Sequence, residues 1–161
     1  MPKVNFEEIL PYSAPDLYDL VMDVERYPDI FNDISGVRAR DTGPHSKNVD
    51  VTVTALFMSL SYNCDVTGIP QSQIDIKALS GDFESMEARW LFETQADGRT
   101  KVRYDMDFDF GGMGFKNAAA MAFIQDGVED TRRMLGAYAA RHLETVPDRQ
   151  GPSAGGAGPA P

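Results

Sequence analysis

The chain has 161 residues and a formal net charge of −10, with 42% hydrophobic and 25% charged residues. This length is typical of one domain with a continuous core, and this composition is typical of a soluble globular protein. The excess of acid argues against a broad nucleic-acid-binding surface, because such surfaces depend on clustered Lys and Arg. We therefore expect a single folded domain over residues 1–146 with no nucleic-acid partner.

The cysteine count and the hydropathy pattern bear on location. Cys64 is the only cysteine, so an intramolecular disulfide is excluded and a reducing compartment is favoured. The N-terminal sequence MPKVNFEEIL has no apolar segment of the length that a secretory signal needs, and no run reaches the roughly 18 apolar residues of a membrane span. We expect a cytoplasmic protein with at most peripheral contact with the inner membrane.

The first thirty residues predict a strand and two helical segments. Residues 4–10 can form a short strand, and Ser13 then offers an N-cap. An apolar stripe at helical spacing follows, formed by Leu17, Leu20, Val21 and Val24. Because Pro28 disfavours helical geometry at Tyr27, we expect the helix to end there and a short second turn to run over residues 29–31.

The middle of the chain alternates apolar and polar residues, which is typical of antiparallel strands with one buried face. In KVRYDMDFDF, residues 101–110, every second residue from Val102 to Phe110 is apolar and the intervening residues are charged. Turn signals divide the region from about residue 35 to residue 110 into about six strands; they lie at residues 41–44, 68–71, 79–82 and 96–99.

The last part of the chain predicts one long helix and a tail. After the glycine-rich GGMG, residues 111–114, helical spacing returns from Phe115 to about Glu144. The order of elements predicts an α+β fold in which a curved antiparallel sheet lies against this C-terminal helix. Residues 147–161 are rich in Pro and Gly and hold almost no large apolar side chains, so we expect a disordered tail there.

No group of residues predicts a catalytic or metal site. His45 and His142 are far apart in the predicted order and lack a partner at a metal-ligand or triad spacing, so we interpret both as surface residues. Cys64 has no evident basic neighbour in the sequence, and we interpret it as a buried structural thiol. Same-face residues of a strand diverge, so a solvated outer face rather than a calcium site is expected for Asp105, Asp107 and Asp109.

The eight methionines are a stronger lead, toward an apolar ligand. Methionine adapts its shape and is common where irregular apolar partners bind, although ordinary core packing explains the same residues. If the sheet curls around the long helix, a cavity is left between them. We predict that this cavity is lined by Phe31, Val53, Phe57, Tyr62, Ile76, Trp90, Phe92, Tyr104, Met106, Phe108, Phe115, Met121, Ile124 and Val128.

Three stretches of the sequence carry a resemblance to a known family. DVERYPDIF, residues 23–31, contains Asp-Val-x-x-Tyr-Pro, and SGDFESMEARWLFET, residues 80–94, contains Gly-x-Phe and later Trp-x-Phe. TKVRYDMDFDF, residues 100–110, contains Thr-x-Val-x-Tyr and then Phe-x-Phe. Over about residues 3–144 the chain resembles the coenzyme Q-binding branch of the START-like (polyketide cyclase and lipid-transport) superfamily. It departs after Phe31, where that branch often has Pro-Trp-Cys and this chain has Asn-Asp-Ile.

The resemblance implies a helix-grip fold, START-like or Bet v 1-like, whose curved sheet wraps around the long C-terminal helix and encloses an apolar tunnel. It also implies a chaperone that binds ubiquinone or another polyprenyl quinone or lipid and supports respiratory electron transport. Such a protein catalyses no reaction, and neither a metal nor a cofactor is expected apart from the bound lipid.

Two other functions stay open. The superfamily includes polyketide cyclases and aromatases, for which Tyr62, Tyr104 and Arg89 are the candidate polar groups, although Arg89 alternates out of phase with Trp90. A neighbouring branch is a ribosome-associated toxin. For that function the candidate surface is a basic patch on the long helix, formed by Arg132, Arg133 and Arg141.

A quinone carrier must exchange its ligand with a bilayer, which requires an apolar mouth. The candidates come from the second helical turn and the glycine-rich corner, and they are Ile30, Phe31, Met113 and Phe115. Because the protein is acidic, anionic lipid would not attract it, and we expect weak, transient, apolar membrane contact.

Overall fold

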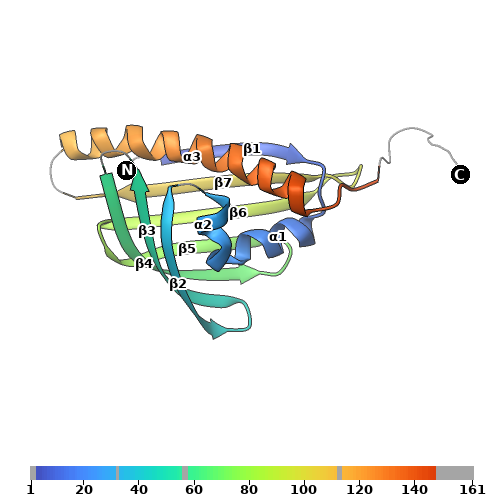
Figure 1. The fold of residues 1–161 in the computed structure, drawn as a ribbon, viewed down its shortest axis with the longest axis horizontal. Helices are drawn as coiled ribbons and strands as arrows, with labels where there is room; N and C mark the ends of the chain where they lie inside the picture. The colour runs from blue at the N-terminus through green and yellow to red at the C-terminus, as the bar shows by residue number, and fades with distance from the viewer. Residues whose placement is uncertain (1–2, 32, 56–57, 112–113, 148–161) are drawn as a thin grey trace, which may run out of the picture.

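The computed structural model describes residues 3–31, 33–55, 58–111 and 114–147, which form one antiparallel sheet and a long C-terminal helix (Figure 1). The strands are β1 (Lys3–Leu10), β2 (Ile34–Gly43), β3 (Ser46–Ala55), β4 (Met58–Ile69), β5 (Gln73–Gly81), β6 (Ser85–Thr94) and β7 (Thr100–Asp109). The helices are α1 (Ala14–Met22), the 3-10 turn η1 (Val24–Arg26), α2 (Tyr27–Ile30) and α3 (Gly114–His142). The α+β architecture expected from the sequence is confirmed.

The seven described strands are ordered β1-β7-β6-β5-β4-β3-β2, and each neighbouring pair is antiparallel. All strands from β2 to β7 are joined in sequence, and β1 closes the order by pairing with β7, with Phe6 opposite Tyr104. The two edges are therefore β1 and β2. Helix α3 runs along β1 at one edge and meets α2, which lies next to β2 at the other edge (Figure 1).

The alternation read from the sequence gives the two faces of the sheet. On β6, Met86, Trp90 and Phe92 are buried, whereas Arg89 is exposed and its guanidinium donates to the Asp75 carboxylate of β5 at 2.6 Å. The outward direction expected for Arg89 is confirmed. The apolar residues of neighbouring strands face the same side because their register is fixed across the sheet, so one continuous core forms beneath the helices.

The outer face also carries the alternate aspartates of β7. Asp105 pairs with Arg103 and Asp107 with Lys3, both partly exposed. These are single surface ion pairs, so a solvated outer face is what the structure shows there. His45 and His142 are both exposed, as expected, and the His142 ring lies 4.1 Å from the Tyr138 ring.

The helical N-terminal region begins as predicted and ends differently. The Ser13 hydroxyl accepts a hydrogen bond from the Asp16 backbone N–H at 3.3 Å, which caps α1. The prediction that α1 reaches Tyr27 is wrong, because the backbone leaves the helical region at Asp23. Pro28 lies in the first turn of α2, where the missing N–H has no intrahelical partner to lose, and so it begins a helix instead of ending one.

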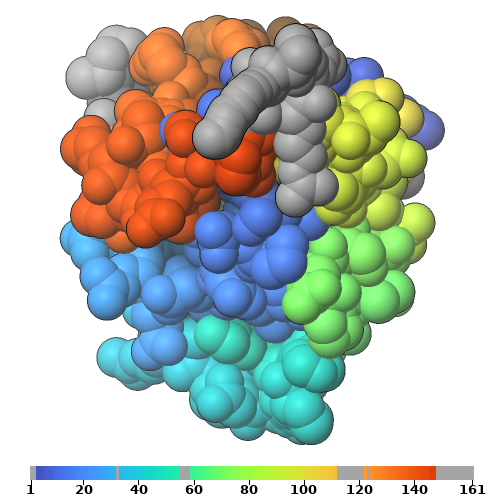
Figure 2. Space-filling view, turned by 90° about the vertical axis from the view of Figure 1, so that its right-hand side faces the viewer, coloured from blue at the N-terminus to red at the C-terminus, as the bar shows by residue number. Residues whose placement is uncertain are grey.

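Helix α1 covers one end of the sheet. In Figure 2 it lies between the C-terminal part of α3, the β2–β3 hairpin and the β4–β5 connection. Its Tyr18 ring packs edge-on against Phe92 of β6, with centroids 6.2 Å apart. Gly68 of β4 lies so close to this tyrosine that an added Cβ would come within 2.0 Å of the hydroxyl oxygen. The tyrosine therefore fills the space that a side chain at Gly68 would need.

The Tyr18 hydroxyl is buried without a hydrogen-bond partner among the described residues. Burying an unpaired hydroxyl costs free energy, so we expect Tyr18→Phe to raise the free energy of unfolding by about 1 kcal/mol, measured by chemical denaturation. Tyr27→Phe is the matched comparison, because the Tyr27 hydroxyl donates to the Val21 carbonyl oxygen at 2.5 Å. That variant should lose about 1 kcal/mol. Equal losses in both variants would contradict the interpretation of Tyr18.

In the described part of the chain, none of the helices combines the length and the apolar character that crossing a membrane requires.

Candidate functional site

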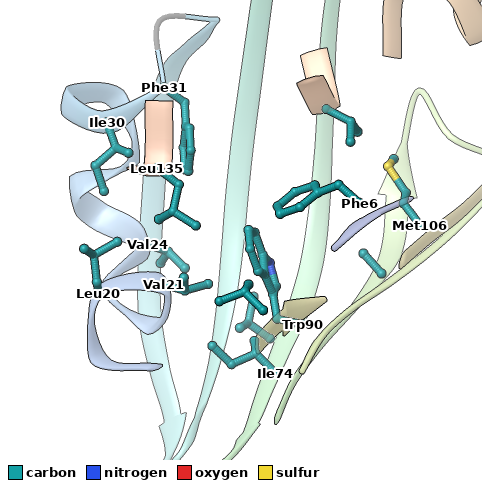
Figure 3. Packing of buried hydrophobic residues seen from close by; sticks show 14 of the residues in the cluster. Phe6, Leu20, Val21, Val24, Ile30, Phe31, Ile74, Trp90, Met106 and Leu135 are labelled. Carbon is teal, nitrogen blue, oxygen red and sulfur yellow. The ribbon is translucent and has the colours of Figure 1, made fainter. Parts of the chain in front are cut away.

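A cavity of about 160 Å³ lies between the inner face of the sheet and α3. Residues of β2 to β7 line it from the sheet side, Ile124, Gly127, Val128 and Thr131 of α3 cover it, and the segment from η1 through Phe31 borders it. Figure 3 shows Val21 and Val24 pointing from the helical segment toward the side of the sheet that carries Trp90 and Phe6. The cavity is therefore lined by residues from Val24 to Thr131, which come from most elements of the domain.

Most of the predicted lining residues whose side chains are described border this cavity. They are Phe31, Val53, Tyr62, Ile76, Trp90, Tyr104, Met106, Ile124 and Val128. Phe57 lies outside the described residues, as do the side chains of Phe115 and Met121 in α3. Of the candidate mouth, Phe31 lines the cavity and Ile30 is buried nearby, whereas Met113 and the Phe115 side chain are not described.

Phe92 and Phe108 do not line the cavity, although both point inward and are buried. Phe92 is covered by Tyr18 of α1. Phe108 packs against Phe83 and Phe110, with ring centroids 6.2 and 5.8 Å away. Alternation gives the face of a strand but not the position along it, and the ends of this sheet are filled by these packing groups.

Several lining residues were not predicted. They are Val24, Tyr27, Asp33, Ile34, Val37, Val49, Val51, Leu60, Cys64, Val66, Phe83, Gly127 and Thr131. Val49 and Val51 share the alternation of Val53, and Cys64 shares that of Tyr62, so extending the same pattern along β3 and β4 would have found them. No sequence signal of this kind exists for Tyr27, which reaches the cavity from the first residue of α2.

The polar groups of the cavity are mainly three phenols and one thiol. The Tyr27 hydroxyl donates to the Val21 carbonyl oxygen, and the Thr131 hydroxyl donates to the Gly127 carbonyl oxygen at 2.7 Å. The Tyr62 and Tyr104 hydroxyls, in contrast, make no hydrogen bond to any described residue. The cavity therefore contains two phenols whose donors are uncommitted.

All four of these acidic groups are held neutral. Burial raises the pKa of Tyr27, Tyr62 and Tyr104 well above the usual value for tyrosine, and the nearby Cys64 raises each of them further. Burial likewise raises the pKa of Cys64 to about 12, with smaller contributions from Asp65 and Asp50. A charge on any of these groups would be costly in this environment.

Cys64 should therefore resist thiol reagents in the native protein. With a pKa of about 12, the thiolate amounts to about one molecule in ten thousand at pH 8, and the thiol is also buried. We expect no measurable reaction with iodoacetamide at pH 8 under native conditions and complete alkylation of one thiol in denaturant, both followed by mass spectrometry. Fast native alkylation would show an accessible, activated thiolate instead.

The described residues offer no metal-binding cluster, and few charged groups border the cavity. They contain no group of three or more His, Cys, Asp or Glu residues placed to hold a metal ion. Among the described lining residues, Asp33 is the one carboxylate, and neither a lysine, an arginine nor a histidine borders the cavity. What the arrangement can do is surround a largely apolar ring and donate hydrogen bonds from neutral groups to polar atoms that the ring carries.

The family model for polyketide cyclase / dehydrase and lipid transport proteins matches residues 10–134. The chain belongs to this family. The match includes every described residue that lines the cavity, from Val24 to Thr131. The START-like resemblance seen in the sequence is thereby confirmed at the level of the family, and the coenzyme Q-binding branch stays a prediction.

Solved structures show that this polyketide cyclase / lipid transport domain has the expected fold. The Zhui aromatase/cyclase of Streptomyces sp. R1128 superimposes with a TM-score of 0.74 at 18% identity, covering 96% of this chain and 98% of that one. A START superfamily protein from Mycobacterium smegmatis gives a TM-score of 0.72 at 20% identity, covering 86% and 97%. The helix-grip prediction is confirmed.

A sequence relative points in another direction. The ribosome association toxin RatA of Pseudomonas aeruginosa is 26% identical to this family member over 117 residues, which cover 73% of this chain and 81% of that protein. The aromatase/cyclase thus shares the fold of this chain and the toxin is a sequence relative of it, and the two names give different functions.

Proposed function

We propose that this protein binds a polyprenyl quinone, with ubiquinone as the leading candidate, or a similar lipid, and does not convert it. The observation that carries the proposal is the cavity of about 160 Å³, whose described lining is apolar apart from neutral phenols, a neutral thiol, Thr131 and Asp33. In the respiratory role that the family resemblance implies, the protein would act as a chaperone for the lipid.

The volume indicates which part of such a ligand is enclosed. Sites for drug-sized ligands measure about 300–1,000 Å³, and an apolar cavity of about 150 Å³ accepts benzene. The cavity of about 160 Å³ therefore suits one substituted ring, the head group of a quinone. At about 25 cal/mol per Å² of apolar surface removed from water, burial of such a ring supplies a few kcal/mol.

The prenyl tail would leave the cavity at the β2 edge of the sheet. Helix α3 packs along β1 at the opposite edge, and α2 is the element that it meets on the β2 side. Asp33, Ile34 and Val37, which line the cavity from the β2 side, are only partly buried. This position agrees with the candidate mouth at Phe31, which borders the same side.

The proposal that the protein is not an enzyme rests on the protonation state of its polar groups. A general base or nucleophile must ionise or be activated near neutral pH. Tyr62, Tyr104 and Cys64 are instead shifted toward the neutral form by burial. A cyclase function would be favoured if the protein cyclised a polyketide mimic and Tyr62→Phe abolished turnover.

Ribosome association is a second candidate, favoured by the RatA relative. Its expected basic patch is largely paired with acid, since Arg132 contacts Glu8 and Glu129, and Arg133 contacts Asp130 at 2.7 Å. If ribosomal subunits are bound, we therefore expect co-sedimentation to be insensitive to Arg132→Gln and to moderate salt. Strong co-sedimentation without lipid binding would make this the first candidate.

The deciding experiment is extraction of the purified protein with organic solvent and mass spectrometry of the extract. A polyprenyl quinone or one other lipid, at close to one molecule per chain after size-exclusion chromatography, supports the proposal. A parallel purification of an unrelated protein from the same cells gives the background. Extracts that match this background, together with no binding of added ubiquinone analogue in calorimetry, would overturn it.

Ligand exchange would involve transient contact with a membrane. Because the net charge is −10, the contact should be apolar and equally weak on neutral and anionic bilayers. Flotation with vesicles of phosphatidylcholine alone and with added phosphatidylserine measures this directly. Recruitment that grows with the anionic lipid would contradict this part of the proposal.

A further inference from the structure

Two tyrosines of the cavity, Tyr62 and Tyr104, have rings that are packed against other aromatic side chains and hydroxyls that lack a hydrogen-bond partner among the described residues. The Tyr62 ring of β4 packs against Phe83 with centroids 5.2 Å apart, and the Tyr104 ring of β7 packs against Trp90 at 4.7 Å and Phe6 at 5.7 Å. Neither hydroxyl has a hydrogen-bond partner among the described residues. Aromatic packing fixes both rings, so their donors are preorganised for a ligand atom.

The backbone also holds Tyr62 in place. Gly81 of β5 lies opposite it, with φ +114°, and a Cβ there would come within 2.5 Å of the Tyr62 Cα and 2.4 Å of the Ser61 carbonyl oxygen. This close approach needs glycine, because both the conformation and the space exclude a side chain. The β4–β5 pairing therefore fixes the backbone from which the Tyr62 ring extends.

The cavity chemistry restricts what can pair with the two donors. An anionic ligand would enter with no lysine, arginine or histidine among the described lining residues, and a cationic one would find Asp33 alone. Burial of a charge without a partner is strongly unfavourable. Because burial raises the pKa of both tyrosines, they stay hydrogen-bond donors throughout the physiological range. A neutral ring with oxygen acceptors is complementary to this site.

We infer that Tyr62 and Tyr104 are the specificity-determining residues of the cavity, and that they select an uncharged ring bearing carbonyl oxygens by donating hydrogen bonds to those oxygens. The inference rests on the proposed binding function and narrows its ligand class. A site that is built to hydrogen-bond a ligand discriminates against the isosteric molecule that lacks the polar atoms, because its buried donors are then left unpaired.

The test compares two probes, tetramethyl-1,4-benzoquinone and 1,2,4,5-tetramethylbenzene, which share a ring and four methyl groups and differ in two carbonyl oxygens. Calorimetry should show that the protein binds the quinone at least about tenfold more tightly than the hydrocarbon. Tyr62→Phe and Tyr104→Phe should each reduce the preference for the quinone over the hydrocarbon by about three- to tenfold. The double variant should bind both probes equally.

Two controls keep the result specific. Tyr138→Phe removes a phenol from α3 that does not border the cavity, and it should change neither affinity. Trp90 is the only tryptophan and borders the cavity, so quenching of its fluorescence by the quinone reports binding at this site.

The outcomes separate the inference from the proposed function. Tight binding of both probes with no preference for the quinone, or a preference that survives the double variant, overturns the inference and leaves the binding function in place. Failure of the wild-type protein to bind either probe overturns the inference, and the lipid extraction described above decides the binding function separately. A preference that falls stepwise through the two single variants and vanishes in the double variant supports the inference.

Discussion

Val51→Trp will abolish ligand binding while leaving the empty protein as stable as the wild type or more stable by about 1 kcal/mol. Val51 lies on β3 opposite Tyr62, is buried, and borders the cavity. The indole has the empty volume of about 160 Å³ to enter, so it gains apolar burial and takes the space of the ring. We expect an affinity loss of more than about 100-fold for a quinone, which corresponds to about 2.7 kcal/mol.

Val102→Trp is the matched control, since it places the same side chain on the same face of the sheet where there is no cavity. Val102 of β7 is fully buried and does not border the cavity. Overpacking should lower its free energy of unfolding by about 1–3 kcal/mol. Chemical denaturation should show a free energy of unfolding that is unchanged or higher in Val51→Trp and lower in Val102→Trp, which would place the void beside Val51. A loss of ligand affinity in Val51→Trp, measured by calorimetry, would place the ligand in the same void. Undiminished affinity in Val51→Trp would show that the ligand binds elsewhere.

The fold was largely predictable because the sequence patterns that indicate it, strand alternation and helix capping, are local, and the alternation recurs from strand to strand. Alternation on β6 and β7 assigns Trp90 and Met106 inward and Arg89 outward, and the structure agrees. The N-cap at Ser13 is equally local. Pro28 shows the limit, because a proline ends one helix or begins another by the same stereochemistry, and the preceding residues decide which occurs.

The cavity was predictable as a class of site but not in its extent. Whether an inward residue borders a void depends on what covers it from another element, as Tyr18 covers Phe92. The hydrogen bond from Tyr27 to Val21 likewise depends on the angle between two short helices. The lack of hydrogen-bond partners for the Tyr62 and Tyr104 hydroxyls is therefore a property of the assembled fold, and no residue spacing in the sequence predicts it.

The same neutrality that suits the cavity to a quinone makes the protein sensitive to alkali. Cys64 and the three cavity tyrosines keep their protons in the folded state beyond their usual pKa values, which are about 9 for the thiol and about 10 for a phenol. Above those values the unfolded chain has released protons that the folded chain still holds. The free energy of unfolding therefore falls as pH rises.

We expect this free energy to be nearly constant from pH 7 to about pH 8.5 and then to fall above about pH 9. Each group that ionises only on unfolding contributes up to about 1.4 kcal/mol per pH unit, first Cys64 and then the tyrosines. Urea denaturation at a series of pH values measures the slope, with reducing agent present to keep the thiol intact. A free energy of unfolding that stays constant up to pH 11 would contradict the raised pKa values of Cys64 and the cavity tyrosines.

The Tyr62→Phe, Tyr104→Phe double variant connects this measurement to the ligand site. It removes two of the groups that must lose a proton on unfolding, so its slope above pH 10 should be shallower by up to about 2.7 kcal/mol per pH unit. All other titrating groups are common to both proteins and cancel in the comparison. The preference for the quinone and the pH dependence of the free energy of unfolding are independent measurements. If both change when these two hydroxyls are removed, both phenols are buried, neutral and free to donate a hydrogen bond to the ligand. Identical slopes would mean that the two phenols already reach solvent in the folded protein, which would remove the basis for selecting a carbonyl oxygen.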